Sequence, residues 1–295
     1  MKRSKGLRGR RRDGSSSTYP LTRANRFGVA GLTLAIFLAS AVANAQTPDA
    51  AVSSDEGSEA YHVEIALGLW NASPDVVISS GTLGIDASDI DFVGDLGLIR
   101  KRLPQLRVVL KAAQRHKVRI GFVPTSYEAQ RTLRRTISFA NTSFNIGIPV
   151  NASLSFPTWY FGYEYDLISR DRGFVGVIGE VRYVRVGADV SSGFLGVAST
   201  LTDEFIPAVG GIARGYLHRR IAVTGEMTWI QIPELIDGLG GGGRTLDFDV
   251  SGLFTFTRNV GIQAGYRTLD VNYRRDADAG SVGLRGMYVN SIIRF

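Results

Sequence analysis

Alternation of apolar and polar residues runs through most of the chain and constrains its fold more than any other feature. The stretch RTLDFDVSGLFTFT, residues 244–257, is the clearest case. Every second position is apolar or glycine: Leu246, Phe248, Val250, Gly252, Phe254 and Phe256. A period of two predicts a β-strand with one apolar and one polar face. IAVTGEMTWI at 221–230 and WYFGYEYDL at 159–167 repeat it, whereas no helical period persists beyond Tyr61.

Ten segments of this kind can be counted, and the connections between them alternate in length. The segments are 60–71, 104–114, 117–129, 152–167, 173–187, 204–217, 220–231, 244–257, 260–273 and 281–295. The short connections are 114–117, 168–173, 218–220 and 257–259, and the long ones are 72–103, 130–151, 188–203, 232–243 and 274–280. This pattern predicts an all-β fold, a closed antiparallel up-and-down transmembrane β-barrel of about ten strands. Eight or twelve strands are alternatives, the latter if 72–103 contains another hairpin.

A soluble secreted barrel would show the same period with its faces reversed, so alternation alone does not decide between the two classes. Many of the segments exceed the roughly five or six residues usual in soluble strands. Aromatic residues also gather near the strand ends, where the interfacial girdles of a membrane barrel belong: Tyr61, Tyr163, Tyr165, Phe174, Trp229 and Phe256. The final segment places Met287, Val289, Ile293 and Phe295 on its apolar face. We therefore expect the membrane barrel.

The basic composition of the chain comes from its N-terminus. Residues 1–45 hold nine of the 34 Lys and Arg residues but one of the 27 acidic residues, so they carry +8 and the remainder −1. This distribution removes the composition argument for a nucleic-acid partner. The basic stretch precedes an apolar run at 27–45 that ends in Ala43-Asn44-Ala45. The order predicts a secretory signal peptide cleaved after Ala45, a flexible linker at 46–59 and the barrel at 60–295.

Two alternatives concern this N-terminal region. The apolar run could stay uncleaved as a membrane anchor, although it is short and rich in alanine for a spanning helix. The basic stretch is also long for a signal peptide, and translation could start further downstream, near Leu21. N-terminal sequencing of the precursor distinguishes these possibilities.

The residue types that carry chemistry are scarce. The chain has no cysteine, which excludes a disulfide framework, thiol chemistry and a cysteine-based zinc site. Its three histidines, His62, His116 and His218, fall in predicted turns or at the start of the first strand. That layout keeps them away from the mouth of the barrel, and the chain has no H-E-x-x-H motif. We expect no enzymatic activity, no cofactor and no catalytic or structural metal.

Two loops raise the question of a ligand. The predicted loop 72–103 contains Asp75, Asp86, Asp89, Asp91 and Asp95, whose carboxylates suit Ca²⁺ or Mg²⁺. Their spacing does not match an EF-hand, and a solvated loop or a lumen plug is favoured. GLGGGGR at 238–244 predicts a flexible loop tip, because no helix follows it as a phosphate-binding loop requires.

The signal peptide, the lack of cysteine and the terminal Phe295 together resemble the bacterial outer-membrane β-barrel superfamily. In that superfamily the barrel-assembly machinery recognises a C-terminal strand that ends in an aromatic residue. Ile293 and Phe295 match the two terminal hydrophobic positions of this signal, whereas Asn290 stands where the signal has glycine. DFVGDLGL at 91–98 and FGYEYD at 161–166 are also similar to stretches in an uncharacterised group of these barrels. The resemblance covers about residues 60–295. It implies a monomer in the bacterial outer membrane, with outer-membrane lipid and the assembly machinery as partners.

If the apolar face of each strand meets lipid, the polar face lines the lumen. Extending the alternation assigns seven acids and six bases to the lumen: Glu64, Arg107, Lys111, Arg119, Glu164, Asp166, Glu180, Arg182, Arg214, Glu226, Asp247, Asp249 and Arg267. Balanced charges in a narrow barrel must pair with one another or with water, whereas a selective pore favours an excess of one sign. Lumen-facing glycines are the counter-argument, since they leave room for water: Gly162, Gly176, Gly210, Gly261 and Gly265.

These charges predict a lumen plugged by ion pairs and therefore a structural or surface-interaction role. A narrow porin for small solutes is the alternative. A lipid- or envelope-modifying barrel enzyme is the third possibility, disfavoured by the positions of the histidines.

Overall fold

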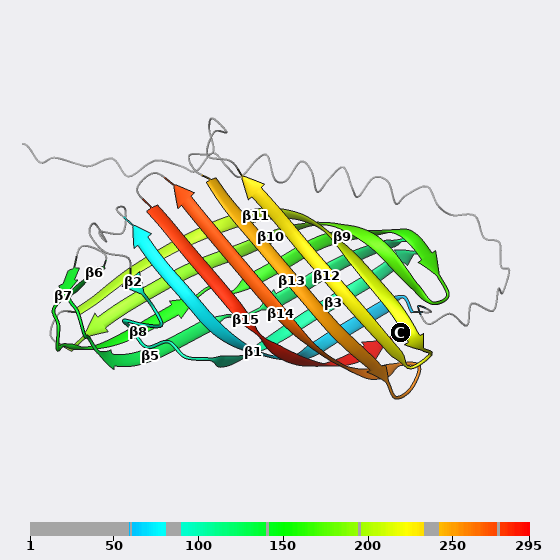
Figure 1. The fold of residues 1–295 in the computed structure, drawn as a ribbon, viewed down its shortest axis with the longest axis horizontal. Coiled ribbons are helices and arrows are strands. Elements are labelled where there is room, and N and C mark those ends of the chain that lie inside the picture. Colours follow the sequence, from blue (N-terminus) through cyan, green and yellow to red (C-terminus); the bar gives the residue numbers. More distant parts are fainter. Residues whose placement is uncertain are drawn as a thin grey trace, which may run out of the picture. The chain divides into compact units, whose positions relative to one another are not determined.

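A computed structural model describes residues 59, 61–80, 90–139, 142–193, 196–232, 242–275 and 278–295 (Figure 1). The strands are β1 (Val63–Ser80), β2 (Ile90–Asp91), β3 (Lys101–Ala113), β4 (His116–Val123), β5 (Ser126–Thr132), β6 (Ile137–Phe139), β7 (Thr142–Phe144), β8 (Pro149–Ser155), β9 (Thr158–Arg170), β10 (Gly173–Ser192), β11 (Gly196–His218), β12 (Ile221–Ile232), β13 (Gly242–Thr255), β14 (Val260–Arg275) and β15 (Asp278–Arg294). Among these residues no helix is long and apolar enough to cross a membrane. The predicted signal peptide and its cleavage point lie outside the described residues.

Ten strands close into one antiparallel barrel, which confirms the predicted fold. The order around the barrel is β1, β3, β4, β9, β10, β11, β12, β13, β14, β15, and β15 pairs with β1 to complete it. β5 continues the line of β4, and β8 leads into β9, each after a two-residue interruption. The interruptions contain Pro124 and Pro157. Proline has no N–H to donate to a sheet, which accounts for a break at these points.

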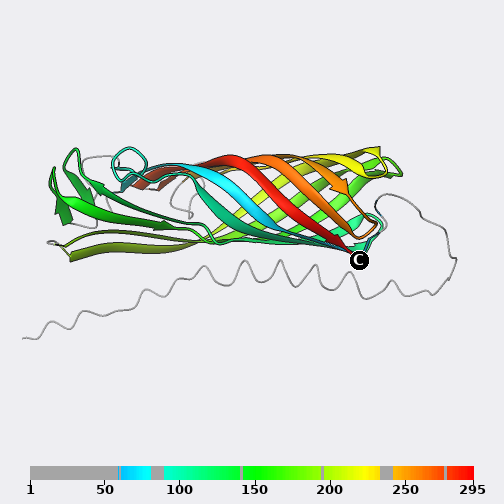
Figure 2. The same cartoon turned by 90° about the horizontal axis from the view of Figure 1, so that it is seen from below.

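The two ends of the barrel differ in their connections. At the turn end the strands are joined through residues 114–115, 171–172, 219–220 and 256–259. Phe295 lies at this end, and its N–H donates to the Val63 carbonyl over 2.9 Å (Figure 2). At the opposite end, the loop end, the longer connections emerge. The β6–β7 hairpin lies between β5 and β8 there (Figure 1).

The strands extend further toward the loop end than the sequence predicted. Residues 188–203 were expected to be a long loop, but β10 and β11 pair along this whole stretch. Their register runs from the pair of Gly173 with Gly215 to the pair of Ser192 with Gly196. Most of 130–151 and 72–80 likewise belongs to strands or to the β6–β7 hairpin. The loop prediction was wrong there because these residues alternate weakly in sequence. Their backbone N–H and C=O groups nevertheless form hydrogen bonds with neighbouring strands.

The outward face of the barrel is apolar, as the alternation predicted. On β9, Phe161 is 50% exposed while the neighbouring Glu164 and Asp166 are buried, and on β15 Met287 is 72% exposed. A continuous exposed apolar surface on this scale indicates a surface built to meet lipid. Two expected girdle residues depart from this pattern. Tyr61 and Phe174 are 5% and 4% exposed and are therefore buried. Phe174 is the first inward residue of β10.

Toward the loop end the barrel wall divides into two facing sheets. β3 and β4 pair no further than Leu106–Phe122, and β11 and β12 no further than Val209–Trp229. Beyond those pairs β5, β8, β10 and β11 form one sheet, and the strands from β12 round to β3 form the other. The space between the sheets is closed by an apolar core.

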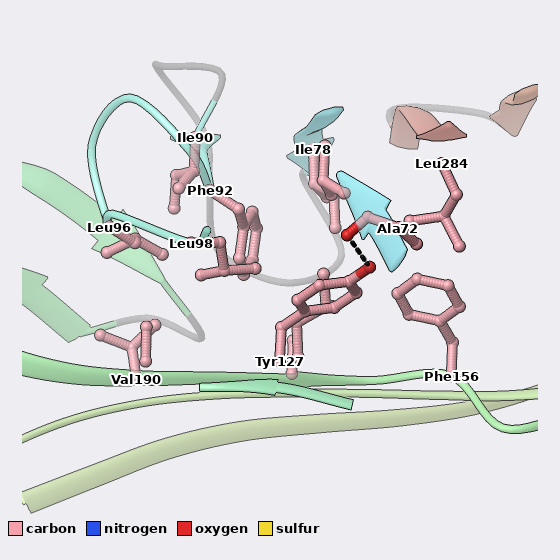
Figure 3. Packing of buried hydrophobic residues seen from close by; sticks show 14 of the residues in the cluster. Ala72, Ile78, Ile90, Phe92, Leu96, Leu98, Tyr127, Phe156, Val190 and Leu284 are labelled. Atoms are coloured by element: carbon pink, nitrogen blue, oxygen red, sulfur yellow. Dashed lines mark hydrogen bonds between the residues drawn. The ribbon is translucent and has the colours of Figure 1, made fainter. Parts of the chain in front are cut away.

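The apolar core includes part of the acidic segment 72–103, for which the sequence predicted a solvated loop or a lumen plug. Ile90, Phe92, Leu96 and Leu98 are at most 2% exposed. They pack among Ile78, Tyr127, Phe156, Val190 and Leu284 from both sheets (Figure 3). The Tyr127 hydroxyl donates to the Ala72 carbonyl across this core, over 3.3 Å. Residues 90–98, hereafter the lid, therefore fill the mouth of the barrel with apolar side chains.

Candidate functional site

The interior of the barrel is the candidate site, and it has two layers. The apolar core with its lid occupies the loop end, and charged side chains occupy the part toward the turn end. Inward positions on all ten strands of the barrel supply these charges, so the layer exists only once the barrel is closed. It contains three groups of contacts.

The turn-end group surrounds Glu64, which is 3% exposed. Its carboxylate lies 2.6 Å from Arg294 Nη2 and 3.3 Å from Arg214 Nη1. Arg214 Nη1 also lies 3.3 Å from Glu59 Oε1, and the Tyr216 hydroxyl donates to the same oxygen. Lys111 Nζ donates to the Glu59 carbonyl over 2.8 Å. Glu59 and Arg294 were not among the predicted lumen charges, Glu59 because it belongs to the expected linker.

The second group is centred on Lys117, which the sequence placed at the boundary of the connection 114–117 and the segment 117–129 and which was not among the predicted lumen charges. β4 begins at His116, so Lys117 is the first inward residue of that strand. It is 1% exposed, and its Nζ lies 2.9 Å from both Glu164 Oε1 and Asp166 Oδ2. The same ammonium lies 3.3 Å from the centroid of the Phe174 ring. One cation thus holds two carboxylates together on an aromatic face.

The central group joins the remaining predicted charges. Arg119 Nη2 lies 2.6 Å from Glu226 Oε2, and Arg107 Nη1 lies 3.8 Å from that same oxygen. On the other side, Asp247 Oδ2 lies 2.6 Å from Arg267 and 3.0 Å from Arg182.

Arg182 also binds Glu180. Asp249 accepts a hydrogen bond from the Tyr288 hydroxyl over 2.8 Å. All thirteen predicted residues are therefore engaged in contacts with other interior side chains or backbone.

Neutral polar residues connect these groups, and of these Gln105 and Gln263 were not among the residues predicted for the lumen. Gln105 Nε2 donates to Asn290 Oδ1 over 2.7 Å, and Asn290 Nδ2 donates to Gln263 Oε1 over 3.1 Å. Asn290 occupies the position at which the assembly signal has glycine. Opposite it stands Gly68, where an added Cβ would lie 2.3 Å from Asn290 Oδ1. The glycine that makes room for this strand pair is on β1 instead of β15.

A cavity of about 70 Å³ remains among the charges of the central group, next to the apolar core. Its walls include Arg119, Arg182, Glu226, Asp249 and Tyr288. That volume accommodates a few water molecules. The expected lumen glycines contribute little further space. At Gly265 an added Cβ would meet the Tyr288 ring at 2.7 Å, and at Gly162 it would meet Glu180 Cβ at 3.2 Å.

The described residues do not assemble a hydrolytic site around a histidine. His116 lies 5.1 Å from the Tyr165 ring and hydrogen-bonds to the Tyr163 hydroxyl, on the outer face near the turn end. His62 and His218 are exposed at the same end. No group of three or more potential metal ligands occurs among the residues that the structure describes.

The acidic residues of 72–103 have partners of their own where they are described. Asp75 pairs with Arg285, and Asp91 accepts the backbone N–H groups of Val93 and Gly94 within the lid. Asp95 binds Arg135, and this hydrogen bond holds the pKa of Asp95 below its ordinary value of 3.8. Asp86 and Asp89 lie outside the described residues, as does most of the glycine-rich stretch at 238–244.

Comparison of the sequence with protein families and with curated proteins finds no match. Among solved structures, the outer membrane protease OmpT from Escherichia coli superposes with a TM-score of 0.52 at 8% identity, over 83% of this chain and 99% of OmpT. Ail, the attachment invasion locus protein of Yersinia pestis, gives a TM-score of 0.37 at 12% identity over 79% and 99% of the two chains. The Pseudomonas putida toluene transporter TodX gives 0.30 at 9% identity over 81% and 90%. The chain has the fold of the bacterial outer-membrane β-barrels.

Proposed function

We propose that this chain is an outer-membrane barrel whose interior is closed to solutes, and that it acts through its surface in a structural or interaction role. The observation that carries the proposal is that both layers of the interior are filled. Ion pairs occupy the part toward the turn end, and the apolar core with its lid occupies the loop end. A barrel of about this strand number encloses little more than its own side chains.

The exposed apolar band supports a position in a lipid bilayer, and the barrel fold supports the outer membrane. In this placement the turn end faces the periplasm and the loop end faces the outside of the cell. Ile293 and Phe295, outward at the end of the chain, serve as the assembly signal in this proposal. The partners are then outer-membrane lipid and the assembly machinery, and the chain is a monomer.

Single-channel conductance of the refolded chain 46–295 in a planar bilayer tests the closed interior. Heat-modifiable gel mobility first establishes that the barrel has folded. We expect no discrete current steps from the folded protein. Reproducible steps would overturn the proposal.

The narrow porin remains the second candidate because of the cavity of about 70 Å³ at the centre of the barrel. A porin would require both the lid and the turn-end group to move aside. If current steps occur, charge reversal at Glu180 or Arg182 on the cavity wall should alter their ion selectivity.

An enzymatic role is not part of the proposal. The likeness to OmpT concerns the fold at 8% identity. The histidines of this chain lie at the turn end, away from the mouth where the loops gather.

A further inference from the structure

The wall of the barrel contains a seam where β3 separates from β4. Above the Leu106–Phe122 pair, β3 remains paired with β1, while β4 leads into β5, which pairs with β8. Residues 101–105 and 126–132 therefore border a gap in the sheet. A hydrogen bond from Lys101 Nζ to Ser126 Oγ, 3.2 Å long, crosses this gap. We call residues 100–106 and 122–132 the seam.

Positive charge gathers on the loop-end side of the seam. The segments 90–102 and 126–135 contain six cations and three carboxylates, a net charge of +3. Two of the carboxylates are already engaged, Asp91 with backbone N–H groups and Asp95 with Arg135. Three consecutive cations, Arg100, Lys101 and Arg102, are all exposed. None of these three lies within ion-pair distance of a carboxylate in the part of the chain that the structure describes.

Two of these cations, Arg100 and Arg102, lie on the outer wall of the barrel. Leu103 is buried, so the alternation of β3 directs Arg102 outward together with Pro104 and Leu106. Arg102 is four residues above Leu106 along the strand, a distance of about 13 Å. Arg100 reaches β1, where its Nε donates to Ser73 Oγ over 2.7 Å. Arg100 and Arg102 therefore border the upper edge of the lipid-facing band, and Lys101, which the alternation places on the opposite face of β3, reaches Ser126 across the gap.

An aromatic strip lies below them on the same outer wall. The Phe122 and Trp159 rings stack with centroids 4.3 Å apart, and the Trp159 and Phe161 rings stack at 6.2 Å. Trp159 and Phe161 are exposed. Phe122 is the register partner of Leu106, so the strip starts where the seam begins. Cations above and stacked rings below make an amphipathic site at the bilayer interface.

We propose that the seam binds a phosphorylated lipid of the outer leaflet. Arg100 and Arg102 bind the phosphate through charge-assisted hydrogen bonds, for which guanidinium groups have suitable geometry, and the Lys101 ammonium at the gap adds its charge. An acyl chain lies along the strip formed by Phe122, Trp159 and Phe161. A soluble polyanion would bind the cations but would make no contact with the aromatic strip. The inference rests on the proposed outer-membrane placement.

Binding of bis-phosphorylated lipid A to the refolded chain 46–295 in a non-ionic, phosphate-free detergent tests this site. The seam variant is R100Q/K101Q/R102Q. The control variant, R170Q/R172Q/R219Q, removes three exposed cations at the turn end. We expect the seam variant to bind at least about tenfold more weakly and the control to bind like the parent. Removal of the phosphates from lipid A should weaken binding to the parent protein to the same extent.

Three results would overturn the site. The first is equal loss of binding in both variants or in neither. The second is unchanged binding of dephosphorylated lipid A. The third is competition by inorganic phosphate at the concentration of the lipid, which would assign the cations to a free anion. Heat-modifiable mobility verifies that each variant is folded. Fractionation of cells tests the outer-membrane placement separately, because that placement can fail while the lipid still binds in detergent.

Discussion

Glu64 and Arg294 lie 230 residues apart in the sequence and form an ion pair inside the barrel, with Arg294 Nη2 2.6 Å from Glu64 Oε2. They are also register partners on β1 and β15, the two strands whose pairing closes the barrel. Both side chains are buried. The pairing of β1 with β15 is therefore stabilised by a side-chain ion pair as well as by the backbone hydrogen bonds between the two strands.

This pair predicts an order of stabilities. Glu64→Gln should be more destabilising than Arg294→Gln, because Glu64 lies between two buried cations, Arg294 and Arg214, and its loss weakens both contacts. Removing one partner of a buried pair typically costs about 3–5 kcal/mol. Urea unfolding followed by heat-modifiable mobility measures the difference. Arg285→Gln, which removes an exposed partner of Asp75, is the control and should change stability by less than about 1 kcal/mol. Equal losses for all three variants would contradict this account.

Lys117 predicts a second large effect. Lys117→Met keeps the length of the side chain but leaves Glu164 and Asp166 as adjacent buried carboxylates without their shared cation. We expect a loss of about 3–5 kcal/mol in the free energy of unfolding. Lys111→Met is the comparison, since Lys111 is less buried and binds one backbone carbonyl. A milder effect of Lys117→Met than of Lys111→Met would show that the second group does not stabilise the barrel.

Gly265 predicts a steric effect. In Gly265→Ala the new Cβ would lie 2.6 Å from the Val250 carbonyl oxygen and 2.7 Å from Tyr288 Cζ, so the ring must move and its bond to Asp249 is strained. Such overpacking costs about 1–3 kcal/mol. Gly252→Ala on the neighbouring strand has open space around the new methyl group and should be close to neutral. If both alanine variants unfold at the same urea concentration, the Tyr288 ring does not pack tightly over Gly265.

The lid should loosen in acid. The pKa of Asp95 is held below 3.8 by its hydrogen bond from Arg135, so this contact stabilises the lid fully above that pH. The contribution is lost as the pH falls through the lowered pKa, because the protonated carboxyl no longer carries charge. Hydrogen exchange of residues 90–98, corrected for the intrinsic rate, measures the effect. Asp95→Asn should show fast exchange already at neutral pH and little further change in acid, whereas an acid response equal to that of the parent would exclude Asp95 as the cause.

The C-terminal residue predicts an effect on assembly separate from stability. Phe295→Ser should lower the amount of folded barrel recovered from the outer membrane, because an aromatic terminus is the expected assembly signal. Leu217→Ser, another exposed apolar residue near the turn end, is the control. Refolding in detergent should proceed alike for both, since the Phe295 backbone bonds are unchanged. Equal recovery of both variants from cells would contradict a signal at Phe295.

Local alternation predicted a closed barrel of about ten strands, and strand length and the positions of the aromatic residues indicated which face is the outer one. A strand directs successive side chains to opposite faces, so residues such as Phe248 and Asp249 reveal their sides without knowledge of any neighbour. The same rule assigned Glu180 and Arg182 to the interior. It failed at strand ends, where one residue decides the assignment: Lys117, at the start of a segment, was not counted among the lumen charges, and Phe174 was placed outside.

The partners of the interior charges and the apolar core depended on closure of the barrel. Glu64 meets Arg294 because register joins the first strand to the last, and no local pattern specifies register between distant segments. The lid is a similar case. Phe92 and Leu96 stand among aspartates in the sequence, and the apolar space they fill exists only because β3 leaves β4 and two sheets face each other there. Burial of an apolar side chain is a property of its surroundings, and those surroundings come from strands far away in the chain.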